Sequence, residues 1–438
     1  MLSLVGLFIV TAVVILLLSG RVMPMIALSL PPCLGAIVLG VNGEQLGVFF
    51  KAGLLKVTPV AVMFVFAILY FSLMNREGLF EPLIRRMVRL SEGSPLRVAV
   101  GTVLVACSAH LDGSGASTFL ITIPALLPLY QRLAMSPLLL MLLVSASASV
   151  MNMLPWGGPL GRTASVIGGD PTALWHVLIP VQGCALLALI GLAAFLGWRE
   201  QGRVTLRDPE ELSQGEDSNQ AQALPAQGVE IEPKRWWLNL TLTLFLLGAL
   251  MSSLAPAPFL FLIATGIALL LNTDNRAAQE QALAEASESA LSMASILFAA
   301  AVFLGVLSGT GMLDALARDL LALTPTVLHG KLHIIIGILG APLELLLNTD
   351  AYYFALMPVV LETVSTAGIS PESGAIALII GNIIGTFISP FSPALWLGLG
   401  LAGVDMGAHI RYALPWIWGL SLFLLLCALS LGTAGLSF

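Results

Sequence analysis

The chain has 438 residues, of which 58% are hydrophobic and 10% are charged, and its formal net charge is −6. A soluble domain carries about 25% charged residues, so this composition excludes an ordinary soluble globular protein. The negative net charge also argues against nucleic-acid binding, which needs basic surfaces to neutralise phosphates. The composition therefore predicts an all-α polytopic membrane protein.

Three short stretches of the first half recur in the second half in the same order, each at nearly the same distance along the sequence. This predicts an internal duplication. The first repeat is predicted at residues 1–198 and the second at 236–438. Between them, residues 199–235 are rich in Gln, Glu, Pro and Ser, and this composition predicts a polar linker. The matched stretches are 74–88 with 307–321, 118–124 with 352–358, and 168–180 with 403–415.

Each repeat is predicted to contain five apolar spans, which gives about ten transmembrane helices. A short amphipathic helix, at 78–90 and again at 311–323, follows the third span and is expected to lie in the membrane interface. The predicted spans are 4–20, 24–41, 57–74, 138–168 and 174–197 in the first repeat, and 237–254, 258–272, 291–309, 372–402 and 412–434 in the second.

Each repeat also has two apolar runs that are too short to cross a bilayer separately, with a polar tip between them. These runs predict two re-entrant helical hairpins, hairpin 1 at about 96–130 and hairpin 2 at about 332–364. The fourth span of each repeat is interrupted by Pro and Gly, which predicts broken helices at 138–168 and 372–402. Paired interruptions in the two repeats are typical of a transporter binding site near the bilayer midplane.

The basic residues predict the orientation. If the hairpins do not cross, five spans in each repeat place the two repeats in opposite orientations. A cytoplasmic linker then puts most of the 19 Lys and Arg residues inside, as the positive-inside rule requires. We therefore expect a multi-pass protein with both termini outside and the linker in the cytoplasm.

The polar residues in the tips and breaks predict an anion that is carried with cations. Arg162 supplies a positive charge suited to a carboxylate. Asp112 and Asp350 would repel an anion unless they bind a cation or a proton, and His110 is a candidate proton carrier. Helix capping by the aspartates and an interhelical bond from Asn152 are the alternative roles. The candidate hydrogen-bonding residues are Ser114, Ser117, Thr118, Asn152, Asn348, Thr349, Thr386, Ser389 and Ser392.

Three stretches resemble the citrate–metal/proton symporter family (CitMHS) of the ion-transporter superfamily. They are HLDGSGASTFLITIPALLPLYQRLAMSPL (110–138), VMNMLPWGGPLGRTASVIGGD (150–170) and DAYYFALMP (350–358). The resemblance implies a homodimer in a bacterial cell (inner) membrane, with scaffold and transport domains and an elevator-type mechanism. It implies import of citrate or a related di- or tricarboxylate, with protons and with a divalent metal such as Mg²⁺ or Ca²⁺, and no bound cofactor.

The family motifs match this chain residue by residue at the first tip, the first break and the second tip. Asp112 and Asp350 are the implied contacts for a metal. Ser114 departs from the family pattern, which has an acidic residue there, so a metal-free carboxylate symporter stays an alternative. A cation/proton antiporter of the same superfamily is a second alternative, and an enzyme is not expected because Ser114 and Ser117 lack an orienting base. The matching residues are Asp112, Gly113, Gly115, Ser117, Thr118, Asn152, Pro155, Gly157, Gly158, Arg162, Asp350, Tyr352 and Tyr353.

Overall fold

The computed structural model describes residues 1–91, 94–205, 233–323 and 325–436. All regular secondary structure in these ranges is helical. The first part contains α1 (Leu2–Ser19), α2 (Pro24–Val38), α3 (Gly43–Arg76), α4 (Glu81–Ser91), α5 (Pro95–Ala109), η1 (His110–Asp112), α6 (Gly115–Arg132), α7 (Pro137–Met151), α8 (Gly158–Ile167) and α9 (Pro171–Thr205).

The second part begins after the linker. The predicted linker falls largely on residues 206–232, which lie outside the described ranges. The elements here are α11 (Pro233–Met251), α12 (Ala257–Asn272), α13 (Arg276–Gly309), α14 (Met312–Leu323), α15 (Thr326–His329), α16 (Leu332–Leu343), the π-helix η2 (Ala351–Leu356), α17 (Met357–Thr366), α18 (Pro371–Ile383), α19 (Pro393–Ala402), α20 (Met406–Ser430) and η3 (Thr433–Gly435).

Helix length and composition agree with a membrane protein. Among the described residues, α1, α3, α9, α13 and α20 are long and apolar enough to cross a bilayer, whereas α2, α7, α12, α16 and α19 are apolar but shorter. Large apolar side chains such as Leu4, Phe8 and Ile15 are exposed along α1. Such side chains are stable at a surface when the surrounding solvent is lipid.

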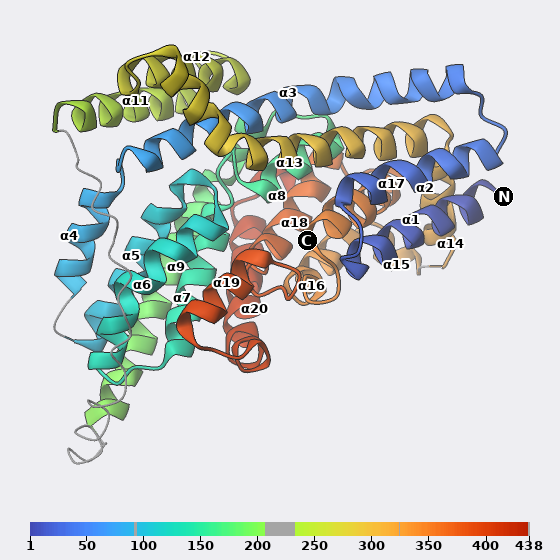
Figure 1. The fold of residues 1–438 in the computed structure, drawn as a ribbon. Coiled ribbons are helices and arrows are strands. Elements are labelled where there is room, and N and C mark those ends of the chain that lie inside the picture. Colours follow the sequence, from blue (N-terminus) through green and yellow to red (C-terminus); the bar gives the residue numbers. More distant parts are fainter. Residues whose placement is uncertain (92–93, 206–232, 324, 437–438) are drawn as a thin grey trace.

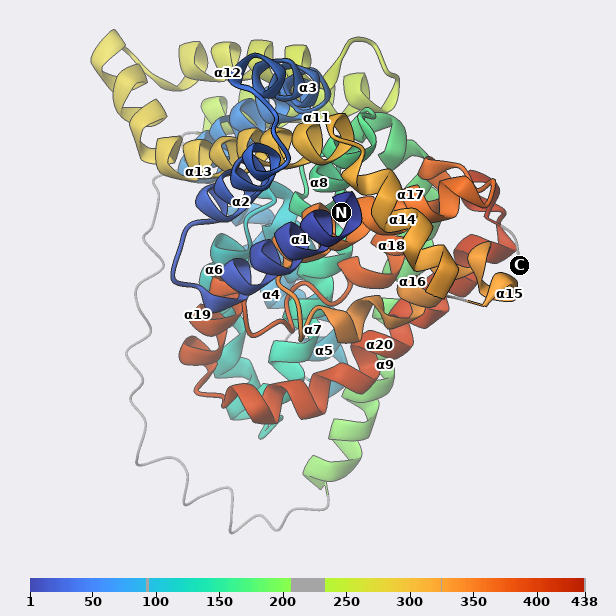
Figure 2. The ribbon, with the colours of Figure 1, turned by 90° about the vertical axis from the view of Figure 1, so that its right-hand side faces the viewer.

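The helices form two packed groups. In one group, α3 packs along α13, with α2 against α13 and α12 against α3. In the other group, α5 packs on α7 and α9, α16 on α18, and α6 on α19. Both ribbon views place α3, α12 and α13 on one side of the molecule and α5, α7, α19 and α20 on another (Figures 1 and 2).

The crossing of α3 and α13 depends on glycine. A Cβ added at Gly53 would lie 2.0 Å from the Ala301 carbonyl oxygen, and one added at Gly305 would lie 2.2 Å from that of Phe49. The two backbones are therefore in direct contact, and any larger residue at these two positions would separate them.

Two helices begin earlier than the predicted spans at 57–74 and 291–309. Helix α3 begins at Gly43 because Asn42 and Gln45 form a capping box, in which each side chain bonds to the other residue's backbone N–H. Helix α13 begins at Arg276, where the Asn275 side chain accepts a bond from Ala278 N. The added turns of α13 are rich in Ala, Glu and Gln, which favour helix, and their charged and amide side chains interrupt the apolar run.

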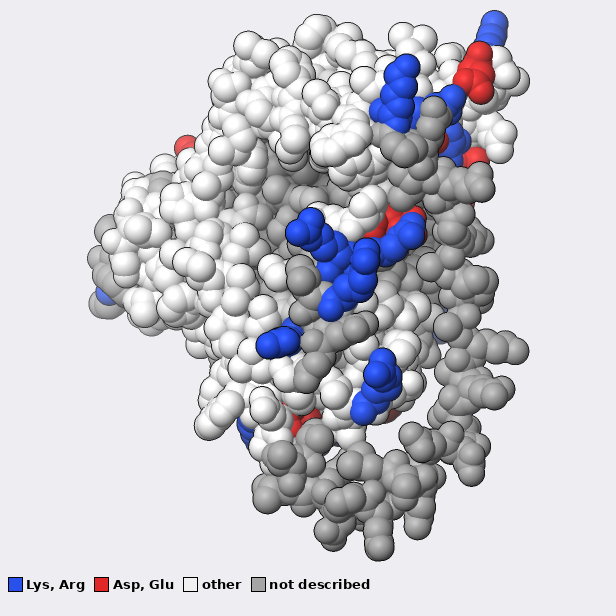
Figure 3. Space-filling view, turned by 90° about the vertical axis from the view of Figure 1, so that its left-hand side faces the viewer, with Lys and Arg blue, Asp and Glu red and all other residues white. Residues whose placement is uncertain are grey.

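Basic residues gather on the face that carries α4. Figure 3 shows Lys and Arg side chains on this face with few acidic neighbours. Exposed arginines of α4 include Arg85, Arg86 and Arg89. The N-terminus lies at the opposite end of the molecule (Figure 1).

Candidate functional site

The tip of hairpin 1 is a tight turn between α5 and α6. Gly113 has φ of 72°, a left-handed conformation that favours glycine. Ser114 caps α6 by accepting a hydrogen bond from Ser117 N. The Asp112 carboxylate accepts bonds from Ser114 N (2.8 Å) and from the Ser117 hydroxyl. This carboxylate is therefore held in place by its own turn.

The first broken helix is tied to this tip by His110. Its Nδ1 atom lies 2.7 Å from Thr118 Oγ1, and its Nε2 atom lies 3.1 Å from Asn152 Oδ1 at the end of α7. His110 and Thr118 are fully buried and Asn152 nearly so. Trp156 adds a second tie, because its Nε1–H donates to the Leu111 carbonyl at 2.9 Å. Together these contacts make hairpin 1 and the first break a single polar cluster.

The tip of hairpin 2 carries a buried ion pair. Arg162 of α8 donates from Nε to Asp350 Oδ1 at 2.7 Å, and both side chains are about nine-tenths buried. Asn348 shapes the tip by accepting from Ala351 N (2.8 Å) and donating to the Leu17 carbonyl of α1 (3.1 Å). The π-helix η2 follows directly, and π-helical turns are frequent at functional sites.

The second broken helix packs against both tips. Ser389 donates to the Glu344 carbonyl of hairpin 2 at 2.7 Å. Phe387 packs edge-on against His110 and Phe119 of hairpin 1, with ring centroids 5.5 Å and 5.8 Å apart. A Cβ added at Gly115 would lie 2.4 Å from the Phe387 ring, so this glycine allows the close contact between hairpin 1 and the second broken helix.

The four interruptions meet at one cavity of about 430 Å³. Ligand sites of small molecules typically have about 300–1,000 Å³. The polar residues that the tips and breaks contribute to its wall are Asp112, Ser114, Ser117, Asn152, Arg162, Thr349 and Thr386, with Gly158 beside them. A Cβ added at Gly158 would lie 2.8 Å from Arg162 Nη1, so the glycine leaves room for the guanidinium group.

The other predicted residues lie behind the cavity wall. His110 bonds to both Thr118 and Asn152, and Asp350 bonds to Arg162, as described above. Gly157 forms the tight turn before α8, since an added Cβ would lie 2.1 Å from the Asn152 carbonyl oxygen. Tyr352 donates to the Leu378 carbonyl at 3.0 Å. The predicted residues outside the cavity lining are His110, Gly115, Thr118, Pro155, Gly157, Asn348, Asp350, Tyr352, Tyr353, Ser389 and Ser392.

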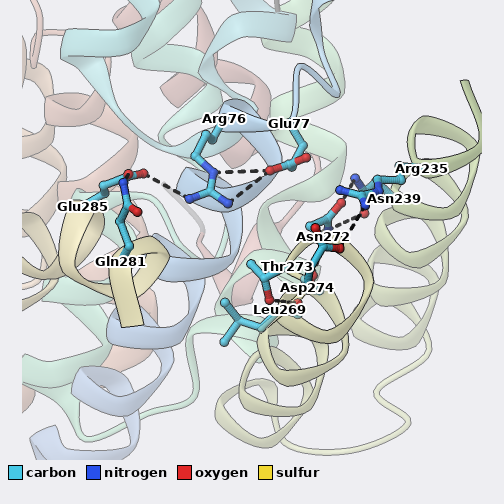
Figure 4. A network of polar contacts seen from close by, with 11 residues as sticks. Arg76, Glu77, Arg235, Asn239, Leu269, Asn272, Thr273, Asp274, Gln281 and Glu285 are labelled. Carbon is cyan, nitrogen blue, oxygen red and sulfur yellow. Dashed lines mark hydrogen bonds and ion pairs between the residues drawn. The ribbon is translucent and has the colours of Figure 1, made fainter. Parts of the chain in front are cut away.

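The opposite wall of the cavity comes from α3 and α13, which the sequence analysis did not include. It contributes the polar residues Ser72, Asn75, Glu285 and Ser289, together with apolar residues such as Phe64 and Met293. Arg76 joins the two helices beside this wall, because it bonds to Glu77 at 3.2 Å and to Glu285 at 3.3 Å (Figure 4). Hydropathy does not reveal such residues, because they lie on otherwise ordinary helices.

Glu344 is a second residue that the sequence analysis missed. It lies at the end of α16, is fully buried, and bonds to Thr349 and Asn382. The signal was its ionisable side chain within an apolar stretch, since such residues in membrane segments are functional candidates.

Comparison with known proteins assigns the family. The family model described as "Citrate transporter" matches residues 2–381. The chain belongs to the citrate transporter family. This confirms the family that the motifs at the first tip, first break and second tip indicated, and it makes the protein a multi-pass membrane transporter.

Citrate transporter relatives cover nearly the whole chain. A Bacillus subtilis protein named "Citrate transporter" is 34% identical over 432 residues, 99% of each chain. A second B. subtilis protein, named "Mg(2+)/citrate complex secondary transporter", is 36% identical over 419 residues, 95% of each chain. The crystal structure of the Alcanivorax borkumensis YdaH transporter has a TM-score of 0.62 at 20% identity and 90% coverage of both chains, which shows a shared fold.

Proposed function

We propose that this protein is a secondary active transporter that imports citrate, or a related di- or tricarboxylate, as a complex with a divalent metal and together with protons. The cavity is the observation that carries the proposal. It joins one arginine, one aspartate and several hydroxyl and amide groups from both hairpin tips and both breaks. Asp350 takes only the Nε–H of Arg162, so the two Nη groups are the donors for a substrate carboxylate.

The metal is proposed to enter as part of the substrate. Among the described residues, no group of three His, Cys, Asp or Glu side chains is arranged to hold a metal ion. The carboxylates of citrate would therefore supply most of the metal ligands, and the Asp112 carboxylate, which lines the cavity, would face the metal side of the complex. The name of the relative that carries an Mg²⁺–citrate complex supports this reading.

Alternating access of the elevator type is proposed for the mechanism. The cavity lies between the two packed groups of helices, with α3 and α13 on one wall and the tips and breaks on the other. The lengths of corresponding helices support two repeats. Helices α3 and α13 each have 34 residues, and α8 and α19 each have 10. In this proposal the group with α3 and α13 is the scaffold, which also forms the homodimer, and the other group moves.

The orientation is proposed from charge. The basic face that carries α4 would lie in the cytoplasm with the linker, and the N-terminus, at the opposite end, would lie outside (Figures 1 and 3). The C-terminus is proposed to lie outside as well. The membrane is proposed to be the bacterial cell (inner) membrane.

Transport by the purified protein in proteoliposomes tests this function. We expect an inward proton gradient to drive accumulation of labelled citrate, with faster uptake when Mg²⁺ or Ca²⁺ is present. Thermal stabilisation by citrate with and without each metal provides an independent measure of binding, because ligands of the native state raise its melting temperature. Stabilisation by citrate alone with no metal effect would favour the metal-free symporter. Proton-driven cation exchange without citrate uptake would contradict citrate transport.

A further inference from the structure

Glu344 forms a polar cluster with Thr349 and Asn382, and of these three residues only Thr349 lines the cavity. Thr349 donates to its Oε1 atom at 2.6 Å, and Asn382 donates from Nδ2 to its Oε2 atom at 2.8 Å. The side chains of Glu344 and Asn382 are fully buried. Thr349 also lines the cavity, so its hydroxyl group connects the carboxyl group with the cavity.

Charge balance around Glu344 is incomplete. The charged groups that face it are Arg162 of α8 and Asp350 of the second tip, and the titratable Tyr352 and Tyr353 of η2 lie close by. Arg162 is already paired with Asp350 at 2.7 Å. One guanidinium group thus faces two carboxyl groups, and an unpaired buried carboxylate is costly unless it takes a proton or a cation.

The hydrogen bonds of the cluster also lack one donor. The Asn382 Oδ1 atom is buried and has no hydrogen-bond partner among the described residues. Thr349 and Asn382 supply donors to the two carboxyl oxygens, which leaves this third acceptor unused. A proton on Glu344 adds a donor, and the Thr349 hydroxyl can either donate to a carboxylate or accept from a carboxylic acid. The cluster therefore accommodates both protonation states.

The first repeat contains a matching cluster without a carboxyl group. His110 ends α5 as Glu344 ends α16, and it bonds to a threonine of its own hairpin and to Asn152 at the end of α7. Glu344 bonds in the same way to Thr349 and to Asn382, near the end of α18. An imidazole thus suffices to hold a hairpin tip to a broken helix. The carboxyl group in the second cluster needs another explanation.

We propose that Glu344 is the residue that binds the coupling proton, a proposal that rests on proton-driven citrate transport. On one side of the membrane the Thr349 hydroxyl passes its proton to Glu344 Oε1, and its oxygen takes a replacement proton from a hydronium ion that becomes water. On the other side the same bonds break and form in reverse, so one proton returns to water and Thr349 ends unchanged. The protonated form balances the cluster while the loaded hairpins move, and Arg162 and Asp350 keep their pair throughout.

Glu344→Gln separates this role from a structural one, because a glutamine retains an oxygen to accept from Asn382 and an amino group to bond Thr349. In proteoliposomes we expect citrate exchange at zero gradient to remain within about twofold of wild type, because exchange moves no net proton. Accumulation driven by a proton gradient should fall by more than about tenfold, which corresponds to about 1.4 kcal/mol. The matched control is Glu362→Gln, because Glu362 is a carboxylate on the same hairpin and lies close to Asp314 and Lys56. The Glu362→Gln protein should accumulate citrate as wild type does.

Proton-driven accumulation in Glu344→Gln equal to wild type would overturn the proposal for Glu344. A wild-type protein that fails to accumulate citrate would instead overturn the proposed function. If the variant does not fold, dicyclohexylcarbodiimide, which modifies protonated buried carboxyl groups, tests the wild-type protein. Mass spectrometry should find the adduct on Glu344 at acidic pH and lose it at alkaline pH. No adduct at acidic pH, or an adduct independent of pH, would contradict the proposal.

Discussion

At the scale of single residues, the ion pair between Arg162 and Asp350 determines what the arginine can do. A free guanidinium group would serve only the substrate, but here its Nε–H also neutralises a buried carboxylate. The pair thus gives Arg162 two roles, one in stability and one in binding. Variants at both positions distinguish these roles.

Arg162→Gln should lower the free energy of unfolding by about 3–5 kcal/mol, because it leaves a buried carboxylate unpaired. Asp350→Asn added to it should restore most of that loss. Neither the single nor the double variant should be stabilised by citrate, since both lack the guanidinium group. Melting temperatures with and without citrate measure both effects. Additive losses in the double variant would show that the two residues are not coupled.

Asp112 is expected to decide whether the metal is recognised. Asp112→Asn keeps an oxygen that can accept from Ser114 N but removes the charge that would face the metal. We expect the Kd for Mg²⁺–citrate to rise at least about tenfold, with a much smaller change for citrate alone. Isothermal titration calorimetry measures both.

Asp405→Asn is the control for that experiment, because Asp405 also caps a helix, accepting from Ala408 N, and lies on an exposed turn. It should bind Mg²⁺–citrate as wild type does. Equal weakening of Mg²⁺–citrate and free citrate by Asp112→Asn would argue against a metal contact.

At the scale of elements, the interlocked helices α3 and α13 are expected to be sensitive to small changes. Gly53→Ala places a methyl group against the Ala301 carbonyl and should destabilise the protein by about 1–3 kcal/mol. Gly266→Ala in α12 is the matched control, since no atom lies within 4 Å of the added Cβ, and it should be neutral or slightly stabilising. Thermal unfolding in detergent compares them, and equal melting temperatures would contradict the close crossing.

The helix interruptions at 110–114, 152–157, 344–350 and 384–392 could be predicted because proline, glycine and polar residues interrupt apolar runs there. The re-entrant course of the two hairpins stays a prediction. The early starts of α3 and α13 could not, because their polar first turns carry no hydropathy signal. The same limit applies to Asn75 and Glu285, whose exposure to the cavity depends on how two long helices pack. Glu344 was overlooked although its charge was visible, since three consecutive leucines, 345–347, follow it directly.

The two aspartates of the tips also illustrate what tertiary contacts decide. Asp112 and Asp350 were predicted as a matched pair, and their metal contact stays a prediction. In the fold, Asp112 bonds to its own turn, whereas Asp350 bonds to Arg162 of α8, far away in the sequence. The residues with matching contacts are His110 and Glu344.

At the scale of the whole molecule, the cavity between the two groups of helices predicts where reagents gain access. With the four native cysteines replaced by alanine, Ser289→Cys on the α13 wall should react with a membrane-impermeant maleimide added from the side of the basic face. Mg²⁺–citrate should slow the reaction by filling the cavity. Labelling unaffected by substrate would show that this wall does not border the binding site.

The parts of the chain before Thr205 and after Pro233 hold each other through packing. Helix α3 lies on α13, α6 on α19, and α1 on α14, while Phe387 packs over Gly115. Contacts this extensive should keep the two parts associated without a covalent connection between them. Residues 1–205 and 233–438 produced as separate chains should therefore co-purify.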